Sequence, residues 1–238
     1  MKPDLKWLVV KDTCAGSGVK TIGPKAFPYP FKPLAIGYHS TGRAIGKLFV
    51  DEEPLARTEG DLAAQFGQEG KLLKIPADAQ KVYAAEREIK LQVTDLSTAT
   101  NRISMAILGL QYTGLTAAVL PRTAKGKLYW INLYKSVGAS LLAIASDESP
   151  FPFMPLAIGY QATARAEVQL TINEIPLFNQ GADLPALFGK NGFVVPIPRD
   201  ARRIYAGKIP FAASITDLSG ATNVVTISFI GVQYPGRG

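Results

Sequence analysis

The sequence predicts an all-β protein made of two tandem, homologous antiparallel β-sandwich or jelly-roll modules, each with one short helix. Three observations lead to this prediction. The stretch Pro28–Tyr38 returns as Pro150–Tyr160. The match continues without a gap over 28–114 against 150–236, and about 39 of the 87 aligned positions are identical. Short apolar runs separated by 17 prolines and 22 glycines are typical of many short strands and turns.

The repeat also predicts the domain organisation. The chain has 238 residues, so the two copies place a first module at 1–120 and a second module at 121–238. Each module is long enough to bury a core without the help of a metal or a disulfide. Residues 115–127 form the expected linker, and 115–120 could add a further strand.

The strands are expected where apolar and polar residues alternate between turn signals. Leu5–Val10 and Leu128–Leu133 open the two modules, and Trp7 is equivalent to Trp130 after a one-residue gap. A loop, a short strand and the repeated proline-rich stretch follow, with the prolines suited to a strand start or a sheet edge. The remaining expected strands are 43–51, 72–75, 89–94 and 102–112 in the first copy, with 165–173, 194–197 and 224–234 among their counterparts.

One helix is expected in each module. Asp61–Gly67 and Asp183–Gly189 both begin with an aspartate that suits an N-cap and end with a glycine. The segments after Pro76 and Pro198 are expected to turn into another strand. Asp95–Asn101 and its counterpart Asp217–Asn223 are rich in side chains that bond nearby backbone, which indicates a structured hairpin connection.

The sequence contains no recognisable catalytic set. His39 is the only histidine, and the second copy has Gln161 in its place, so a Ser-His-Asp or Cys-His arrangement lacks a repeated base. Cys14 is the only cysteine, which excludes an intrachain disulfide and leaves too few ligands for zinc. We therefore expect no catalytic residues, no metal site and no cofactor, and we expect that the protein is not an enzyme.

Repeated carboxylates and aromatics are the remaining candidates for chemistry. A glycosidase would need two of the repeated carboxylates beside a cleft, but most of them fall at turns or helix caps, where a structural role is favoured. Calcium could bind the Asp95 and Asp217 loops, although the regular calcium-loop pattern is missing. The repeated aromatics, such as Trp7 and Trp130, are expected in the core. The repeated carboxylates are Glu52/Glu174, Asp61/Asp183, Asp78/Asp200 and Asp95/Asp217.

Charge and hydropathy narrow the partners further. The net charge is +7, but the basic residues are scattered, and a nucleic-acid binder usually shows a basic stripe with aromatics between its charges. The sequence has no apolar run long enough for a membrane helix, and the N-terminus lacks the apolar core of a signal peptide. We expect no membrane or nucleic-acid partner, and synthesis in a host cytoplasm.

The two copies differ most in surface charge. The first carries 15 basic and 12 acidic residues up to Leu120, and the second carries 11 and 7. Loss of charge from a solvated face indicates a binding surface. We expect this face to contact another subunit, or else the other module of the same chain. The candidate interface residues, which stand where the first copy has charges or in the replaced stretch 208–215, are Met154, Phe193, Ile209, Phe211 and Val224.

In general style the chain resembles virion structural proteins of bacteriophages. The features that carry this resemblance are the two Pro-Leu-Ala-Ile-Gly-Tyr strands, the paired Asp-Leu-Ser-x-Ala-Thr-Asn hairpins and the Gln-Tyr-x-Gly module ends. The resemblance implies a jelly-roll capsid, head-decoration or vertex protein of the virion. It further implies self-association, with a trimer favoured over a monomer, and contacts with other virion proteins.

The alternative hypothesis for the same sequence pattern is a tandem carbohydrate-binding or receptor-binding module. It would expose roughly coplanar aromatic side chains that bind a glycan, whereas a shell protein would expose a flat apolar interface.

Overall fold

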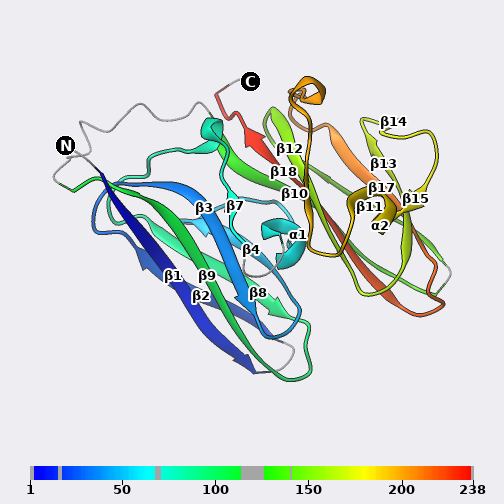
Figure 1. Ribbon diagram of the computed structural model, residues 1–238, viewed down its shortest axis with the longest axis horizontal. Coiled ribbons are helices and arrows are strands. Elements are labelled where there is room, and N and C mark those ends of the chain that lie inside the picture. Colours follow the sequence, from blue (N-terminus) through cyan, green and yellow to red (C-terminus); the bar gives the residue numbers. More distant parts are fainter. Residues whose placement is uncertain (1–2, 16–17, 68–70, 114–125, 140, 237–238) are drawn as a thin grey trace. The chain divides into compact units, whose positions relative to one another are not determined.

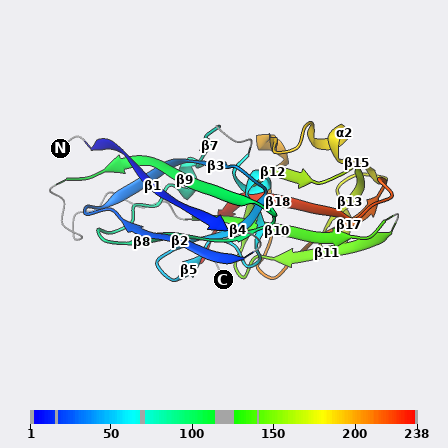
Figure 2. The same cartoon turned by 90° about the horizontal axis from the view of Figure 1, so that it is seen from below.

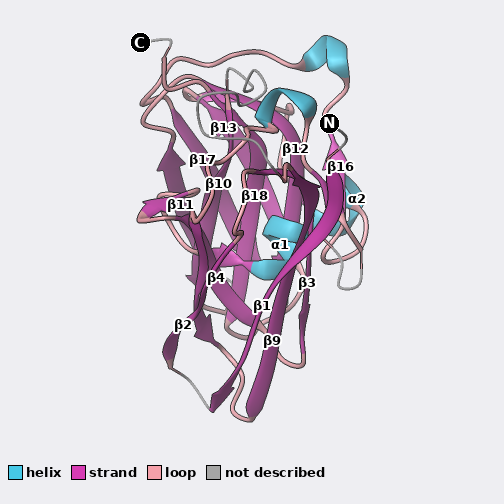
Figure 3. Ribbon diagram, turned by 90° about the vertical axis from the view of Figure 1, so that its left-hand side faces the viewer, coloured by secondary structure: helices cyan, strands magenta, loops and turns pink. Residues whose placement is uncertain are grey.

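A computed structural model of the protein describes residues 3–15, 18–67, 71–113, 126–139 and 141–236. Strands dominate these residues, and the helices are short (Figure 3). No helix in the described part of the chain is long and apolar enough to span a membrane. The chain divides into two compact units: Met1–Leu55 with Glu69–Leu128, and Ala56–Gln68 with Tyr129–Gly238.

The first unit contains two antiparallel sheets (Figure 1). Their strand orders are β1-β9-β3-β7 and β2-β8-β4-β5. Figure 2 shows them as two layers, with β3 and β9 in one layer and β2 and β8 in the other. The strands are β1 (Asp4–Ala15), β2 (Val19–Ala26), β3 (Phe31–Ser40), β4 (Ala44–Val50), β5 (Glu53–Pro54), β7 (Leu73–Lys74), β8 (Glu88–Asp95) and β9 (Thr100–Gln111).

The second unit has the same strand order in both sheets, β10-β18-β12-β16 and β11-β17-β13-β14. Eight strands in two such sheets form a jelly roll, so the predicted all-β fold class is confirmed. The elements are β6 (Gly60–Asp61), α1 (Leu62–Phe66), β10 (Lys127–Val137), β11 (Leu142–Glu148), β12 (Phe153–Ala162), β13 (Ala166–Ile172), β14 (Ile175–Pro176), β15 (Ala182–Asp183), α2 (Leu184–Phe188), β16 (Val194–Pro196), β17 (Pro210–Asp217) and β18 (Asn223–Gln233).

The core of each unit lies between its sheets, because alternate residues of each strand point inward. In β8, Ile89, Leu91 and Val93 are buried and alternate with half-buried polar residues. In β17, Phe211, Ala213 and Ile215 are buried and alternate with the half-buried residues Ala212, Ser214 and Thr216.

The repeated prolines Pro33 and Pro155 lie near the start of an inner strand of each unit, so of the two expected positions, a strand start or a sheet edge, the structure shows the strand start. Strand β3 runs between β9 and β7, and its register with β9 shifts between Pro33 and Ala35. Strand β12 shows the same shift between Pro155 and Ala157. Proline has no N–H to donate to a sheet, so a bulge beside it accommodates the missing bond.

The segments after Pro76 and Pro198 form the expected turns, as the 3₁₀ turns η1 (Ala77–Ala79) and η3 (Arg199–Ala201). The strand expected after each turn is reduced to a single β-bridge, Tyr83 with Phe31 and Tyr205 with Phe153. The module boundary expected at residue 120, and the strand proposed at 115–120, lie outside the described residues. The compact units also place Ala56–Gln68 with the second half of the chain, although this segment belongs to the first copy in sequence.

Replacing Gly231 with alanine should destabilise the second unit by about 1–3 kcal/mol. A methyl group there would overlap the Met154 carbonyl oxygen and the Phe153 ring, neither of which can move without disturbing the bulge. Urea unfolding followed by circular dichroism measures the change. Gly236→Ala is the control, because nothing lies within 4 Å of a Cβ at that position. Equal stability of the two variants would contradict this account of the bulge.

Candidate interaction surface

The outer side of β1 exposes a row of large apolar side chains. Leu5, Trp7 and Val9 are 61%, 51% and 45% exposed. Leu8 and Val10, which point to the other side of the strand, are buried in the core. Strand β1 therefore has apolar residues on both of its sides, a pattern typical of strands that are covered on both faces. Across the ladder these residues pair with Leu110, Leu108 and Ala106 of β9. We call the side chains of Leu5, Trp7, Val9, Ala106, Leu108 and Leu110 the open face.

The equivalent strand of the second unit is covered. Trp130 on β10 corresponds to Trp7 and has no exposed surface. The segment Ala56–Gln68 covers it: the indole Nε1–H of Trp130 donates to the Gln65 carbonyl oxygen at 3.0 Å. The Phe66 ring meets the indole edge-on, with 5.4 Å between ring centroids. One side of this unit is thus covered by helix α1, which belongs to the first copy of the sequence repeat.

Close approach of helix α1 to the sheet depends on a glycine. A Cβ at Gly159 of β12 would overlap the Ala64 carbonyl oxygen, so only glycine lets the helix backbone lie this close. Ala64 and Gln65 are fully buried as a result. Asp61 begins the helix and accepts a hydrogen bond from Ala63 N at 2.9 Å, as its sequence position predicts.

A polar network fixes the beginning of the covering segment. Thr58 Oγ1 donates to Asp147 Oδ2 at 2.7 Å, and the Asn132 side chain donates to the Thr58 carbonyl oxygen at 2.9 Å. Ser228 Oγ in turn donates to Asn132 Oδ1 at 2.8 Å. Burial raises the pKa of Asp147 above its ordinary value, although the bonds from Thr58 and Glu148 act against this. The network holds the segment in one register because each buried polar group needs its partner.

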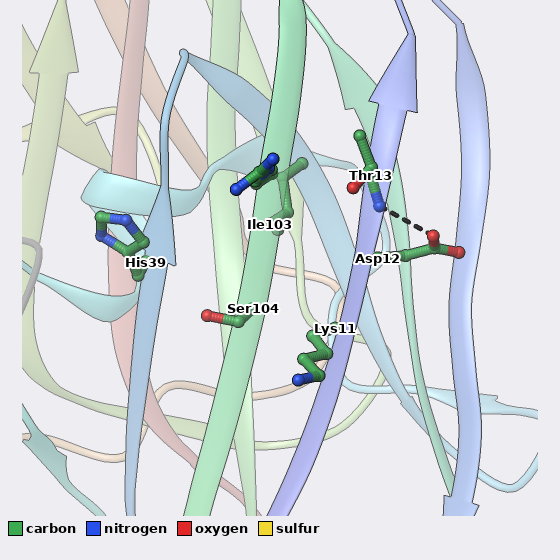
Figure 4. Close-up of a pocket in the computed structure, with 7 residues that line it drawn as sticks. Lys11, Asp12, Thr13, His39, Ile103 and Ser104 are labelled. Carbon is green, nitrogen blue, oxygen red and sulfur yellow. Dashed lines mark hydrogen bonds between the residues drawn. The ribbon is translucent and has the colours of Figure 1, made fainter.

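The open face continues into a shallow hollow that holds His39 (Figure 4). Figure 4 shows Lys11, Ser104 and His39 on the neighbouring strands β1, β9 and β3. His39 lies opposite Ser104 in the register of the two strands. These residues give this end of the face a polar and basic character.

A catalytic serine would need an acid behind its histidine, and Asp12 does not supply it. Side chains alternate along a strand, so Asp12 points to the opposite side of β1 from Lys11 and Thr13. Its carboxylate instead pairs with Lys20 at 2.9 Å. Hydrogen bonds from Lys20 and from Thr13 N hold the pKa of Asp12 below its ordinary value.

The residues predicted as an interface do not form one patch. Phe211 is a core residue: it is 1% exposed, and its ring packs against Phe153 and Phe229. Ile209 packs against the same core cluster. Met154 and Val224 are half-buried but far apart. Val224 lies near the start of β18, whereas Met154 of β12 pairs with Val232 near the end of β18. Val232 lies eight positions after Val224 on this strand, a length of about 27 Å.

Phe193 is the most exposed member of the predicted set, with 39% of its surface exposed. For Phe193 and the half-buried residues Met154, Ile209 and Val224, a role in an interface stays a prediction. For Phe211 the structure corrects it, because a side chain inside the core does not reach a partner.

The repeated carboxylates mostly serve local structure. Asp95 Oδ1 accepts hydrogen bonds from Ser97 N and Asn101 Nδ2, both at 2.9 Å. Burial alone would raise the pKa of Asp95, but these bonds outweigh burial and lower it. Asp217 makes the equivalent bond to Asn223 Nδ2 at 3.2 Å. Asp183 differs from Asp61, because it pairs with Arg165 at 2.6 Å and does not cap its helix.

The residues that the structure describes contain no cluster of side chains suited to bind a metal ion. Among these residues no three His, Cys, Asp or Glu side chains group closely enough to hold a metal ion. Cys14 is a buried free thiol, and burial raises its pKa.

The covering segment is the feature that sequence reasoning missed. Two signals for it were present. The run Leu128–Leu133 has apolar residues on both sides of the strand, and Leu62–Phe66 is a short, mostly apolar helix that could cover one of these sides. The repeated tryptophans were both expected in the core, and Trp7 is the one that is exposed.

Removing the two equivalent tryptophans should have very different effects on stability. Trp130→Ala should lower the free energy of unfolding by about 3–5 kcal/mol, because it empties a fully packed site. Trp7→Ala should lower it by less than about 1 kcal/mol in the monomer, because half of that side chain already faces water. Urea unfolding at low protein concentration measures both changes. Equal losses would contradict the conclusion that Trp130 is covered and Trp7 is not.

Neutralising Asp147 should make the stability of the protein depend less on pH. With a raised pKa, the folded state binds a proton more tightly than the unfolded state. The stabilising contribution is therefore present below the unfolded pKa and is lost as pH rises through the folded pKa. Asp147→Asn keeps an acceptor for Thr58 and removes the buried charge. Unfolding curves from pH 4 to pH 8 should show a flatter pH dependence for this variant, and Asp200→Asn, which changes an exposed 3₁₀ turn, is the control.

No protein-family profile matches the sequence, and no curated protein matches it. Its fold is similar to the major capsid protein P2 from bacteriophage PM2, with a TM-score of 0.51 and 10% identity over 98% of this chain and 99% of that chain. More distant matches include a structure of infectious bursal disease virus Gx strain (TM-score 0.24, 10% identity, 100% and 73% covered) and the vicilin from Solanum melongena (0.21, 9%, 92% and 74%), and neither carries an argument. The chain thus shares its fold with this phage capsid protein over nearly the whole length of both chains.

Proposed function

We propose that this chain is a virion structural protein, as a capsid, head-decoration or vertex component, and that it works by assembly and not by catalysis. The observation that carries the proposal is the fold similarity to a phage major capsid protein over nearly the whole of both chains. A match over both jelly rolls is more specific than a match to one, because single jelly rolls occur in many unrelated proteins.

The surface of the molecule supports assembly as its activity. The open face is a contiguous apolar area on a sheet, and soluble monomers seldom leave such areas exposed. The proposed partners are other copies of this chain, arranged as a trimer, and other virion proteins. Its proposed location is the virion, after synthesis in the host cytoplasm. Phe193, Met154 and Val224 remain proposed contact residues.

Analytical ultracentrifugation should find a species of about three times the 25.5 kDa chain mass at micromolar concentration. Electron microscopy of concentrated samples should show ordered assemblies. Phe193→Asp should weaken higher assembly about tenfold or more, because it places a charge in an apolar contact. Leu177→Asp is the control, since Leu177 has a similar exposure of 42% and leucine stands in both copies. A protein that stays monomeric at every concentration, and forms no assemblies, would contradict the proposal.

A carbohydrate-binding module is the second candidate, and exposed Trp7 favours it. An exposed indole, on the same side of β1 as Lys11 and about 13 Å along the strand from it, offers a sugar chain a stacking surface, and the hollow around His39 offers hydrogen-bond partners. Glycan-array binding that disappears in Trp7→Ala, together with a monomeric protein, would support this candidate over the shell protein.

A further inference from the structure

The contact that covers Trp130 has two halves, and the chain contains a second copy of each half. One half is the sheet face around Trp130, and its second copy is the open face around Trp7. The other half is the segment Ala56–Gln68 with helix α1. The gapless part of the repeat aligns this segment with Phe178–Lys190, which contains helix α2. In the first pair the two halves meet, and in the second pair both are exposed to water.

Helix α2 leaves uncovered the side that α1 buries. Ala64 and Gln65 of α1 have no exposed surface. Their counterparts are Ala186, which is exposed, and Leu187, which is half-buried because it packs partly against the core of its own unit. The opposite side of α2 is anchored in its own unit, where the ring of Phe188 lies 5.8 Å from that of Tyr160. The helix is thus fixed in place, and its outward side presents the small apolar residues Pro185 and Ala186.

The open face has the shape that such a helix requires. Gly37 of β3 is the counterpart of Gly159, the residue that admits the backbone of α1. In the described structure the nearest atom to a Cβ at Gly37 belongs to the Leu72 side chain, which is 47% exposed and able to turn aside. Gly37 and Ala106 are neighbours in the register of β3 and β9, so the glycine lies on the open face.

The sheet surface and the helix surface differ from the covered contact in the same way: both have apolar residues where the covered contact has polar ones. In the covered contact, polar Asn132 and Ser228 lie on the sheet, and Gln65 lies on the helix. At the equivalent positions the open face has Val9 and Ala106, and α2 has Leu187. Both sides of the second contact have therefore become apolar, which suits a pair of surfaces that bury each other.

We infer that a second copy of this chain binds the open face through the outward side of its helix α2. The contact repeats between chains the packing of Ala56–Gln68 within the second unit. It rests on the self-association in the proposed function, but it does not require that the assembly be a shell. Each chain has one open face and one α2, so the contact is head-to-tail, and successive copies close into a ring or grow as a filament.

Single charges should break either half without unfolding the chain, because both sites are exposed. Trp7→Asp disables the open face, and Ala186→Asp disables the helix. Each should weaken self-association by about 30-fold or more, the effect expected of a hot-spot residue. Val19→Asp is the control: Val19 is 65% exposed on the other sheet of the first unit, and this change should leave association unaltered. Circular dichroism melting verifies that all three variants are folded.

Mixing the two variants tests the head-to-tail geometry. Each variant alone should be monomeric in sedimentation. A 1:1 mixture should form dimers that contain one of each variant and grow no further, because the helix of Trp7→Asp binds the intact face of Ala186→Asp and the other two halves are disabled. Homodimers of Ala186→Asp alone would show a face-to-face contact and overturn the inference.

A spectroscopic reading identifies the buried residue. The chain has two tryptophans, so fluorotryptophan labelling gives two ¹⁹F resonances, which Trp7→Phe assigns. On association only the Trp7 signal should shift and lose solvent accessibility. If the wild-type chain associates while Trp7 stays accessible and both charge variants associate normally, the inference is wrong and the proposed function stands. If the wild-type chain never associates, both fail.

Discussion

A strand that is apolar on both sides is stabilised when both sides are removed from water, and this requirement organises the second half of the molecule. Strand β10 meets it by packing one side into the core and placing the other under Ala56–Gln68. Burial of a tryptophan removes a large apolar area from water, so the contact contributes strongly to stability. The compact units follow this burial and not the sequence repeat, which is why a segment of the first copy belongs to the second unit.

The polar network at the start of the covering segment adds specificity to this apolar contact. Asp147, Thr58 and Asn132 satisfy one another only in one register of segment and sheet. Apolar packing alone tolerates small shifts, whereas a buried carboxylate without its partners carries a large desolvation cost. At the positions of Asn132 and Ser228 the first unit has Val9 and Ala106, so this part of the open face offers apolar contacts in place of the network.

Much of the fold could be predicted from local patterns. Alternation located the main strands, and the Asp61 cap and closing Gly67 located α1. The interface prediction was less accurate, because it compared whole stretches of the two copies. Phe211 replaces Ile89, which is also buried, so the change there enlarges a core side chain and does not remove a surface charge. Reading the alternation of β17 residue by residue would have separated Phe211 from its solvent-facing neighbours.

The sequence by itself determined the strands, the helices and the hairpin turns, because these depend on neighbours a few residues apart. Which surface covers which was decided only by the tertiary structure. The carbonyl that accepts the Trp130 indole hydrogen bond lies 65 residues earlier in the chain. Two identical residues, Trp7 and Trp130, lie on equivalent strands, yet one is exposed and the other is sealed. Local sequence does not distinguish them, because burial depends on a distant segment that reaches one strand and not the other.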